Sequence, residues 1–177
     1  MNILKDNLPL VSLSIPTFNG DKYLEEALLS AIDQSYKNLE IIVVDDCSRD
    51  NLKKYIFRLD SKVDYIRHKE NQGVVASRMT GNRAAKGKYI AFLDDDDIWL
   101  PEKIEKQVAL FEQKGIDCAV VTCGAKIIRE RGGAVYNMPN ISGNIRSGIL
   151  KYGLTTIPSS HLFSREHFDQ MGGYDLI

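Results

Sequence analysis

The chain has 177 residues, of which 44% are hydrophobic and 27% are charged, as is typical of one soluble globular domain. Its 23 lysines and arginines nearly balance its 24 aspartates and glutamates, so the net charge is -1. This balance gives the whole molecule no attraction to nucleic acid or to an anionic membrane. No segment reaches the roughly 20 apolar residues of a membrane span, and the N-terminus lacks the apolar run of a signal peptide.

The first hundred residues alternate strand and helix patterns. Short apolar, β-branched runs predict strands over Leu10–Ile15, which ends at Pro16, and over Glu40–Asp45, Val63–Arg67 and Lys88–Leu93. Apolar residues at helical spacing predict helices that begin at Asp21, cover Asn51–Leu59 and Gly73–Ala85, and begin again at Pro101. Four strand–helix units with short connections predict an α/β fold, with a mostly parallel central sheet and helices on both faces.

After Gly115 the pattern changes to short strands. We predict strands over Ala119–Cys123 and Ser159–Phe163, a hairpin from Ala125–Ile128 and Ala134–Asn137, and a short helix over Ser142–Tyr152. A boundary near Lys114 would divide one domain into two halves that share the sheet.

The cysteines predict neither a disulfide scaffold nor a zinc site. Cys47, Cys118 and Cys123 are odd in number, and their spacing fits no zinc motif. We therefore expect free thiols that pack as small residues in a reducing cytoplasm.

Polar residues follow the predicted parallel strands, at the edge where ligands bind in open α/β sheets. The strongest signal is Asp94–Asp97, four aspartates directly after a buried strand. Neighbouring carboxylates repel, so the run needs a reason, and a divalent cation that takes carboxylate and phosphate oxygens is one. The alternative is that these side chains face water and cap the helix near Pro101.

Other residues at the same edge have two interpretations each. Asp45 and Asp46 suit hydrogen bonds from a nucleobase N–H or a ribose hydroxyl, or else they form a turn and a helix cap. Arg78 and Arg83 present planar forks that suit phosphate, or else they lie on a solvated helix face. Two loops, Pro16–Asn19 and His68–Gly73, also follow predicted strands at this edge. Trp99 either lines the site or packs in the core. His161 either lies near a cleft or is an ordinary packed or surface histidine, as we expect for His68 and His167.

Motifs of several other enzyme classes are absent. The chain has no Gly-x-Gly-x-x-Gly after its first strand, no phosphate loop of the ATPase kind and no Gly-x-Ser-x-Gly elbow. The aspartate pairs and runs also resemble, loosely, motifs of two other classes of protein. A response-regulator receiver domain would need a lysine after a later strand, and a haloacid-dehalogenase-type phosphatase would carry its Asp-x-Asp after the first strand, not the fourth.

Two long segments resemble the family 2 glycosyltransferases, which have the A-type glycosyltransferase fold. They are VSLSIPTFNGDKYLEEALLSAIDQSYKNLEIIVVDDCSRD and HKENQGVVASRMTGNRAAKGKYIAFLDDDDIWLPEKIEKQ, nearly continuous from Val11 to Gln107. The later segment HLFSREHFDQMGGYD resembles the family's pre-catalytic region. The resemblance implies a Rossmann-like nucleotide-diphospho-sugar transferase fold, with a nucleotide-sugar-binding half over 1–114 and a partial acceptor-side half over 115–177.

The resemblance also implies metal-dependent, inverting transfer of a sugar from a nucleoside-diphosphate sugar to an acceptor hydroxyl. We expect a UDP-sugar donor, with guanosine and thymidine open, Mn2+ or Mg2+, and a carbohydrate or lipid-linked acceptor in polysaccharide or glycolipid synthesis. The location would be the cytoplasm or the inner face of the cell membrane. The implied metal ligands are Asp94 and Asp96. The implied nucleotide contacts are Pro16, Thr17, Phe18, Asp45, Asp46, Arg78, Asp94 and Asp95.

The family's general base is an aspartate some residues after a Gly-Gly-aromatic-Asp turn. That turn corresponds to Gly172–Asp175, which only Leu176 and Ile177 follow, so we expect the base beyond Ile177. The catalytic residue is therefore unknown, and the acceptor-side half is C-terminally incomplete. Our hypothesis is donor binding with weak or no transfer, and a non-catalytic nucleotide-sugar-binding module is the remaining alternative.

Overall fold

In the computed structural model, which describes residues 8–20, 23–49, 52–129, 132–137, 142–143 and 157–174, the first half follows the predicted apolar runs. Its strands are β1 (Val11–Thr17), β2 (Leu39–Asp45), β3 (Asp64–Arg67) and β4 (Tyr89–Phe92). Its helices are α1 (Leu24–Ile32), α2 (Leu52–Leu59), α3 (Val74–Ala84) and α4 (Lys103–Lys114).

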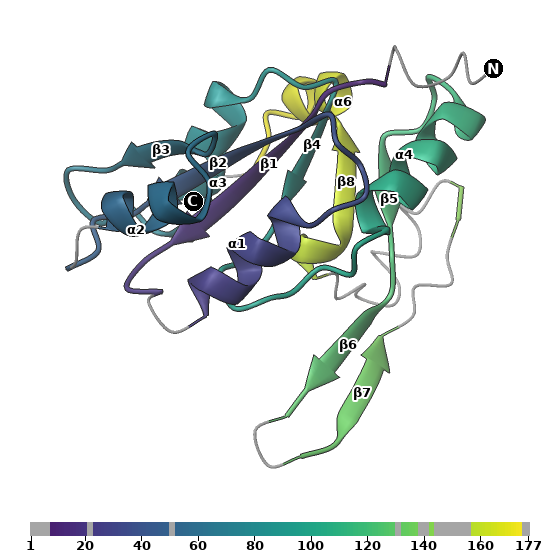
Figure 1. Ribbon diagram of the computed structural model, residues 1–177. Helices are drawn as coiled ribbons and strands as arrows, with labels where there is room; N and C mark the ends of the chain where they lie inside the picture. The colour runs from purple at the N-terminus through teal and green to yellow at the C-terminus, as the bar shows by residue number, and fades with distance from the viewer. Residues whose placement is uncertain are drawn as a thin grey trace.

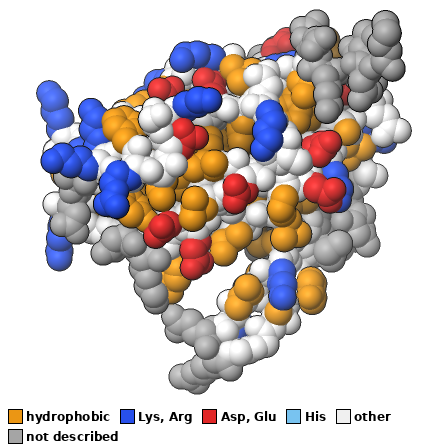
Figure 2. All heavy atoms as spheres, in the orientation of Figure 1, with side chains coloured by type: hydrophobic (Ala, Val, Ile, Leu, Met, Phe, Trp, Pro, Cys, Tyr) orange, Lys and Arg blue, Asp and Glu red, His pale blue; other side chains and the backbone are white. Residues whose placement is uncertain are grey.

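The second half adds β5 (Val120–Thr122), β6 (Ala125–Ile128), β7 (Ala134–Asn137), the 3-10 helix η1 (Pro158–Ser160), β8 (His161–Ser164) and α6 (Arg165–Gln170). The predicted hairpin is confirmed, and β6 and β7 form a separate sheet that projects from the body (Figure 1). Hydrophobic side chains of this hairpin lie at the surface (Figure 2). The helix predicted over Ser142–Tyr152 lies outside the described residues beyond position 143.

The main sheet has the strand order β3-β2-β1-β4-β8-β5 (Figure 1). Strands β1 to β4 pair in parallel, and β8 is antiparallel to both of its neighbours, so β5 again runs parallel to β1. Apolar residues of α1, α2 and α4 pack on one face, and those of α3 and α6 pack on the other. The predicted mostly parallel sheet with helices on both faces is confirmed.

Helix α3 packs closely on β1 because both elements carry small residues at their contact. Ser12 and Ser14 point to the face opposite Leu13 and are fully buried. A Cβ added to Gly81 would lie only 1.9 Å from the Ser14 Oγ, so glycine is needed at this position. The close approach also fixes Arg78, one helical turn before Gly81, beside the edge of the sheet.

Several predicted boundaries differ from the structure, most of them by one residue, and three of the differences have a physical reason. β1 continues through Pro16 to Thr17, because its pairing with β4 ends at Ser14 and a missing N–H beyond that point breaks no ladder hydrogen bond. α4 begins at Lys103 rather than Pro101, whose carbonyl instead accepts the Ser35 N–H at 2.9 Å. The last strand begins at His161 because η1 occupies the three preceding residues.

Two further findings concern the whole described part of the chain. All three cysteines are free, as predicted, and each is partly buried. Among the residues described, no helix has both the length and the apolar character to cross a membrane.

Candidate active site

The loops after β1, β2 and β4 meet at one edge of the sheet, where the carboxyl ends of the parallel strands lie. The Thr17 hydroxyl donates to the Asp95 carboxylate at 2.6 Å, which ties the β1 loop to the β4 loop. The Asp46 N–H donates to the Thr17 carbonyl at 2.8 Å, which ties the β2 loop to the same point. Segments far apart in the sequence therefore form one surface, as the sheet topology requires.

The four aspartates form a turn at this edge, which we call the acidic turn (Asp94–Asp97). The Asp97 N–H donates to the Asp94 carbonyl at 3.1 Å, so Asp95 and Asp96 occupy the two central positions. Asp94, Asp95 and Asp97 are partly buried, and Asp96 is exposed. Asp96 accepts no hydrogen bond from any residue that the structure describes.

The acidic turn concentrates negative charge in a partly buried place. Burial raises the pKa of Asp95, the charges of Asp96 and Asp94 raise it further, and the Thr17 hydrogen bond opposes the rise. Burial also raises the pKa of Asp97 against a hydrogen bond from Ser159. A positive charge placed beside the turn would relieve this repulsion.

The acidic turn fits a divalent cation that shares its ligands with a substrate. No three His, Cys, Asp or Glu side chains within the described ranges form a complete metal cage. Magnesium-type ions commonly use one or two carboxylates and complete their shell with substrate phosphates and water. Asp96, which is exposed, and Asp94, whose side chain is 27% exposed, offer that donor set.

Arg78 on α3 supplies a cation beside the acidic turn. The residue is nine-tenths buried, and its guanidinium forms an ion pair with the Asp94 carboxylate and lies 5.7 Å from the centroid of the Tyr174 ring. The Nε of Arg78 is buried and has no hydrogen-bond partner. An arginine held in place with an unused donor is suited to receive a phosphate oxygen.

Asp46 holds the loop that follows β3. Its carboxylate accepts the His68 Nδ1 at 2.7 Å and the backbone N–H groups of Gln72 and Gly73 at 2.9 and 2.7 Å. The side chain is 4% exposed, so these internal partners surround it. Contact between Asp46 and a nucleobase stays a prediction.

Asp45 is enclosed by partners from β3 and from the loop after β2. Its carboxylate accepts the Tyr65 hydroxyl, the Arg67 Nη1 at 2.8 Å and the Ser48 N–H at 2.8 Å. Burial would raise the pKa of Asp45, but the hydrogen bonds from Ser48 and Tyr65 and the charge of Arg67 lower it below its usual value. The same surroundings raise the pKa of Tyr65 to about 12. Contact between Asp45 and a nucleobase likewise stays a prediction.

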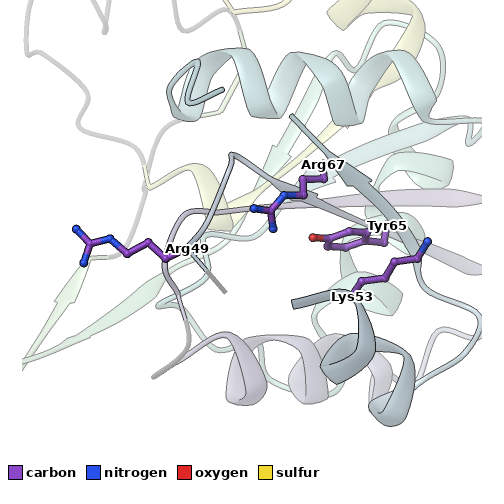
Figure 3. Close-up of a pocket in the computed structure, with 4 residues that line it drawn as sticks. All are labelled: Arg49, Lys53, Tyr65 and Arg67. Carbon is purple, nitrogen blue, oxygen red and sulfur yellow. The ribbon is translucent and has the colours of Figure 1, made fainter. Parts of the chain in front are cut away.

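A hollow of about 440 Å³ lies beside Asp45 and is lined by Arg49, Lys53, Tyr65 and Arg67 (Figure 3). Figure 3 shows the side chains of Arg49 and Lys53 extending in opposite directions, with Tyr65 and Arg67 between them. The positive charges of Arg49 and Lys53 therefore do not converge on one point. The hollow is a positively charged surface at the edge of the sheet and does not form a binding site for a single anion.

The remaining candidates separate into packed and exposed residues. Trp99 and His161 are buried, and the indole N–H of Trp99 donates to the Ser159 carbonyl at 2.8 Å. Phe18 is 51% exposed at the end of β1, whereas Pro16 is buried. Arg83 is exposed on α3, on its solvated side.

Sequence reasoning missed three partners of the candidate residues. Tyr65 and Arg67 surround Asp45, and the signal for them was the parallel pairing of β2 with β3, which places Arg67 opposite Asp45. Ser159 contacts the acidic turn, and no local pattern indicated this contact.

The fold is that of the A-type glycosyltransferases, as solved structures show. S. aureus TarS 1-349 in complex with UDP-GlcNAc has a TM-score of 0.75 and 22% identity, covering 92% of this chain and 47% of that chain. The mannosyltransferase PcManGT from Pyrobaculum calidifontis, in complex with GDP-Man and Mn2+, has a TM-score of 0.71 and 20% identity, covering 97% of this chain and 49% of that chain.

The chain belongs to glycosyl transferase family 2, whose sequence profile matches residues 12–172. It is 36% identical over 128 residues to TuaG of Bacillus subtilis (strain 168), a glycosyltransferase named for a provisional role in teichuronic acid biosynthesis. The match covers 70% of this chain and 50% of TuaG, so the chain spans about half the length of such relatives. The predicted family and fold are confirmed.

Proposed function

We propose that the chain binds a nucleoside-diphosphate sugar at the edge formed by β1, β2 and β4, for metal-dependent, inverting transfer to an acceptor hydroxyl. The observation that carries this proposal is the meeting of Arg78 with the acidic turn, a cation that suits phosphate beside carboxylates that suit a divalent metal. UDP-GlcNAc in TarS and GDP-Man in PcManGT support a nucleotide-sugar donor, and we propose a UDP-sugar.

Each residue of the edge has a role in this proposal. Asp96 and Asp94 would hold Mn2+ or Mg2+, and PcManGT with Mn2+ supports a divalent ion of this kind. When bound, the ion supplies positive charge that stabilises the departing nucleoside diphosphate. Arg78 binds a phosphate oxygen through its guanidinium, which is not fully paired in the ligand-free chain, and Thr17 keeps Asp95 in place beside the donor.

The nucleoside half of the donor lies toward β2 in this proposal. Asp46 and Asp45 fix the floor of that side through their contacts with the loop after β3 and with Arg67. Pro16 and Phe18 border it from β1, and the exposed ring of Phe18 is available to pack against a base.

The acceptor and the location are further parts of the proposal. We propose a carbohydrate or lipid-linked acceptor in the synthesis of an envelope polysaccharide or glycolipid, at the cytoplasmic face of the cell membrane. The name of TuaG supports an envelope polysaccharide. Transfer requires a general base that removes the proton of the acceptor hydroxyl, and inversion requires this base to lie across the sugar from the leaving group.

Thermal unfolding with UDP, GDP or TDP, each with and without MnCl2, tests the donor site. A ligand at about 100 times its dissociation constant adds about 2.7 kcal/mol, which for a chain of this size raises the unfolding midpoint by about 5 to 10 °C. We expect this rise with UDP and manganese together, and a smaller one with either alone.

Two variants make the result specific. Asp96→Asn removes a proposed metal ligand and should abolish the manganese-dependent rise. Asp117→Asn removes an exposed aspartate that precedes β5, at the opposite edge of the sheet, and should keep the full rise. A rise of equal size in both variants would contradict the metal site, and no rise with any nucleotide would contradict donor binding.

A further inference from the structure

We propose that Ser159 is a positioning residue of the donor site, which fixes the acidic turn in the conformation that leaves Asp96 open to a metal ion. This inference rests on the proposed function, because it concerns the metal-binding role of that turn. It assigns part of the donor site to the second half of the chain, which the first half alone cannot complete.

The hydroxyl of Ser159 binds the first residue of the acidic turn and faces the last. Ser159 lies in η1 and is 5% exposed. Its Oγ accepts the backbone N–H of Asp94 at 3.0 Å, and the same hydroxyl lies close enough to Asp97 to lower the pKa of that carboxyl. A serine hydroxyl has one donor and two acceptor positions, so it can accept the Asp94 N–H and still present its proton toward Asp97. One side chain therefore binds the first residue of the turn and faces the last.

The backbone of Ser159 holds the segment that follows the turn. Its carbonyl accepts the indole N–H of Trp99 at 2.8 Å. The other side of the contact is fixed by Lys103, whose ammonium lies 3.9 Å from the centroid of the Trp99 ring. The chain from Asp94 to Trp99 is thus attached to η1 at both ends.

These contacts leave one carboxylate of the acidic turn open. Asp94 pairs with Arg78, Asp95 accepts the Thr17 hydroxyl, and Asp97 is partly buried beside the Ser159 hydroxyl. Asp96 is the exposed member of the four and accepts no hydrogen bond from the described residues. With its neighbours fixed, Asp96 has a defined direction before any ligand binds. A ligand side chain that is already ordered loses less entropy on metal binding, and partners outside the ligand set supply that order.

The test compares two serines that differ only in their contacts. Ser160 is the next residue in η1, is 6% exposed, and bonds to the Ile157 carbonyl at 2.7 Å and to the Thr122 hydroxyl at 3.1 Å. Neither partner belongs to the acidic turn. Ser160→Ala is therefore the matched control for Ser159→Ala, with the same atom lost from the same helix at the same burial.

The first readout is the affinity for manganese with UDP present, from the electron paramagnetic resonance signal of free Mn2+, well below the unfolding midpoint of each variant. We expect Ser159→Ala to weaken manganese binding about tenfold, which corresponds to about 1.4 kcal/mol. Ser160→Ala should stay within about twofold, and Ser159→Thr, which keeps the hydroxyl, should recover most of the affinity. A role in stability alone would lower the unfolding midpoint without changing the affinity of the folded chain.

The second readout needs no ligand. The Asp97 N–H donates to the Asp94 carbonyl within the turn, so its hydrogen exchange reports whether the turn is fixed. Ser159→Ala should accelerate this exchange about tenfold, and Ser160→Ala should not. Equal manganese affinity in the two alanine variants, or unchanged exchange in Ser159→Ala, would overturn the positioning role.

Different samples test the proposed function and the positioning role of Ser159. If the unaltered chain binds no manganese with UDP, the proposed function is wrong, and the positioning role for metal binding is wrong with it. If the unaltered chain binds and Ser159→Ala binds equally well, only the positioning role is wrong.

Discussion

The aspartates that end β2 and those that follow β4 lie at the same edge of the sheet but have different surroundings. Asp45 and Asp46 are buried, and their carboxylates are surrounded by donors from β3 and the loop after it. The acidic turn is partly exposed, and burial and mutual repulsion raise the pKa of Asp95 and Asp97. Buried carboxylates with a full set of donors stabilise the fold, whereas crowded carboxylates with few donors are left for a ligand.

The comparison shows that aspartates have two different roles at this edge of the sheet. At β2 the chain itself supplies the donors that an ionised carboxylate needs, so these aspartates are part of the scaffold. At β4 the part of the chain that the structure describes supplies one cation, Arg78, for four carboxylates. The remaining charge is what the proposed metal would balance. Four substitutions in the ligand-free chain test this difference.

The largest effect is expected for Asp46→Ala. It leaves the backbone N–H groups of Gln72 and Gly73 without their acceptor and removes the partner of His68. Loss of one member of a buried, hydrogen-bonded network costs about 3 kcal/mol, or about 6 to 12 °C in the unfolding midpoint. Urea unfolding followed by circular dichroism measures it. Asp64→Ala, at an exposed position on β3, is the control, and equal losses in both variants would contradict a scaffold role for Asp46.

A smaller loss is expected for Arg78→Gln, which removes the only basic partner of the acidic turn among the described residues. The buried guanidinium also contacts Tyr174, so both a charged hydrogen bond and packing are lost. We expect a decrease of about 2 kcal/mol in the free energy of unfolding. Arg83→Gln changes the same residue type on the exposed side of α3 and should cost less than about 0.5 kcal/mol. Similar losses would show that the pair with Asp94 contributes nothing.

The dependence of stability on pH should have opposite signs at the two places. The pKa of Asp45 is lower in the folded chain, so its stabilisation exists above the unfolded value near pH 4 and disappears as the pH falls through the folded value. The pKa of Asp95 is higher in the folded chain, so its contribution is greatest below about pH 4 and is lost as the pH rises through the folded value.

Asp95→Asn measures the second contribution. The amide oxygen still accepts the Thr17 hydroxyl, but the charge is gone. We therefore expect the variant to be about 0.5 kcal/mol more stable than the unaltered chain at pH 7, after screening by solvent, and equal to it near pH 3. Unfolding in urea across this range gives the difference. A variant that is less stable at pH 7 would show that the acidic turn stabilises the ligand-free fold.

The smallest effect on stability is expected for Asp96→Asn. This side chain is exposed and accepts no hydrogen bond from the described residues, so the free energy of unfolding should change by less than about 0.5 kcal/mol. The same substitution should abolish the manganese-dependent effect of UDP. This result would show that Asp96 serves binding and not stability, whereas Asp46 serves stability. A destabilised Asp96→Asn chain would contradict this difference.

The sequence was sufficient for the first half of the fold because each element there is encoded locally. The apolar runs before Pro16, Asp45 and Asp94 are short, buried strands, and the helices between them have regular apolar faces. Parallel strands joined by helices leave few possible topologies. The hairpin of β6 and β7 was equally local, since a glycine-containing turn joins two short strands.

The place of β8 between β4 and β5 could not be predicted, because antiparallel pairing between distant segments has no local signal. The same is true of the site. The sequence predicted that Arg78 and the acidic turn would lie at one edge, but not that Arg78 would pair with Asp94. It did not predict that Asp46 would use its carboxylate on the loop His68–Gly73, or that Ser159 would contact Asp94. These contacts depend on side-chain directions that only the packed structure defines.

The strand order has a consequence for the order in which the sheet can form while the protein chain is being synthesised. β8 lies between β4 and β5, so β5 has no partner in the sheet until residues 161–164 have been made. Asp94 and Ser159 are 65 residues apart, which takes about 3 to 13 s at 5 to 20 residues per second. Until then the edge of β4 that pairs with β8 lacks this partner, and the Asp94 N–H lacks its Ser159 acceptor. The edge of the sheet that holds the acidic turn is therefore completed late, although most of its described residues are made early.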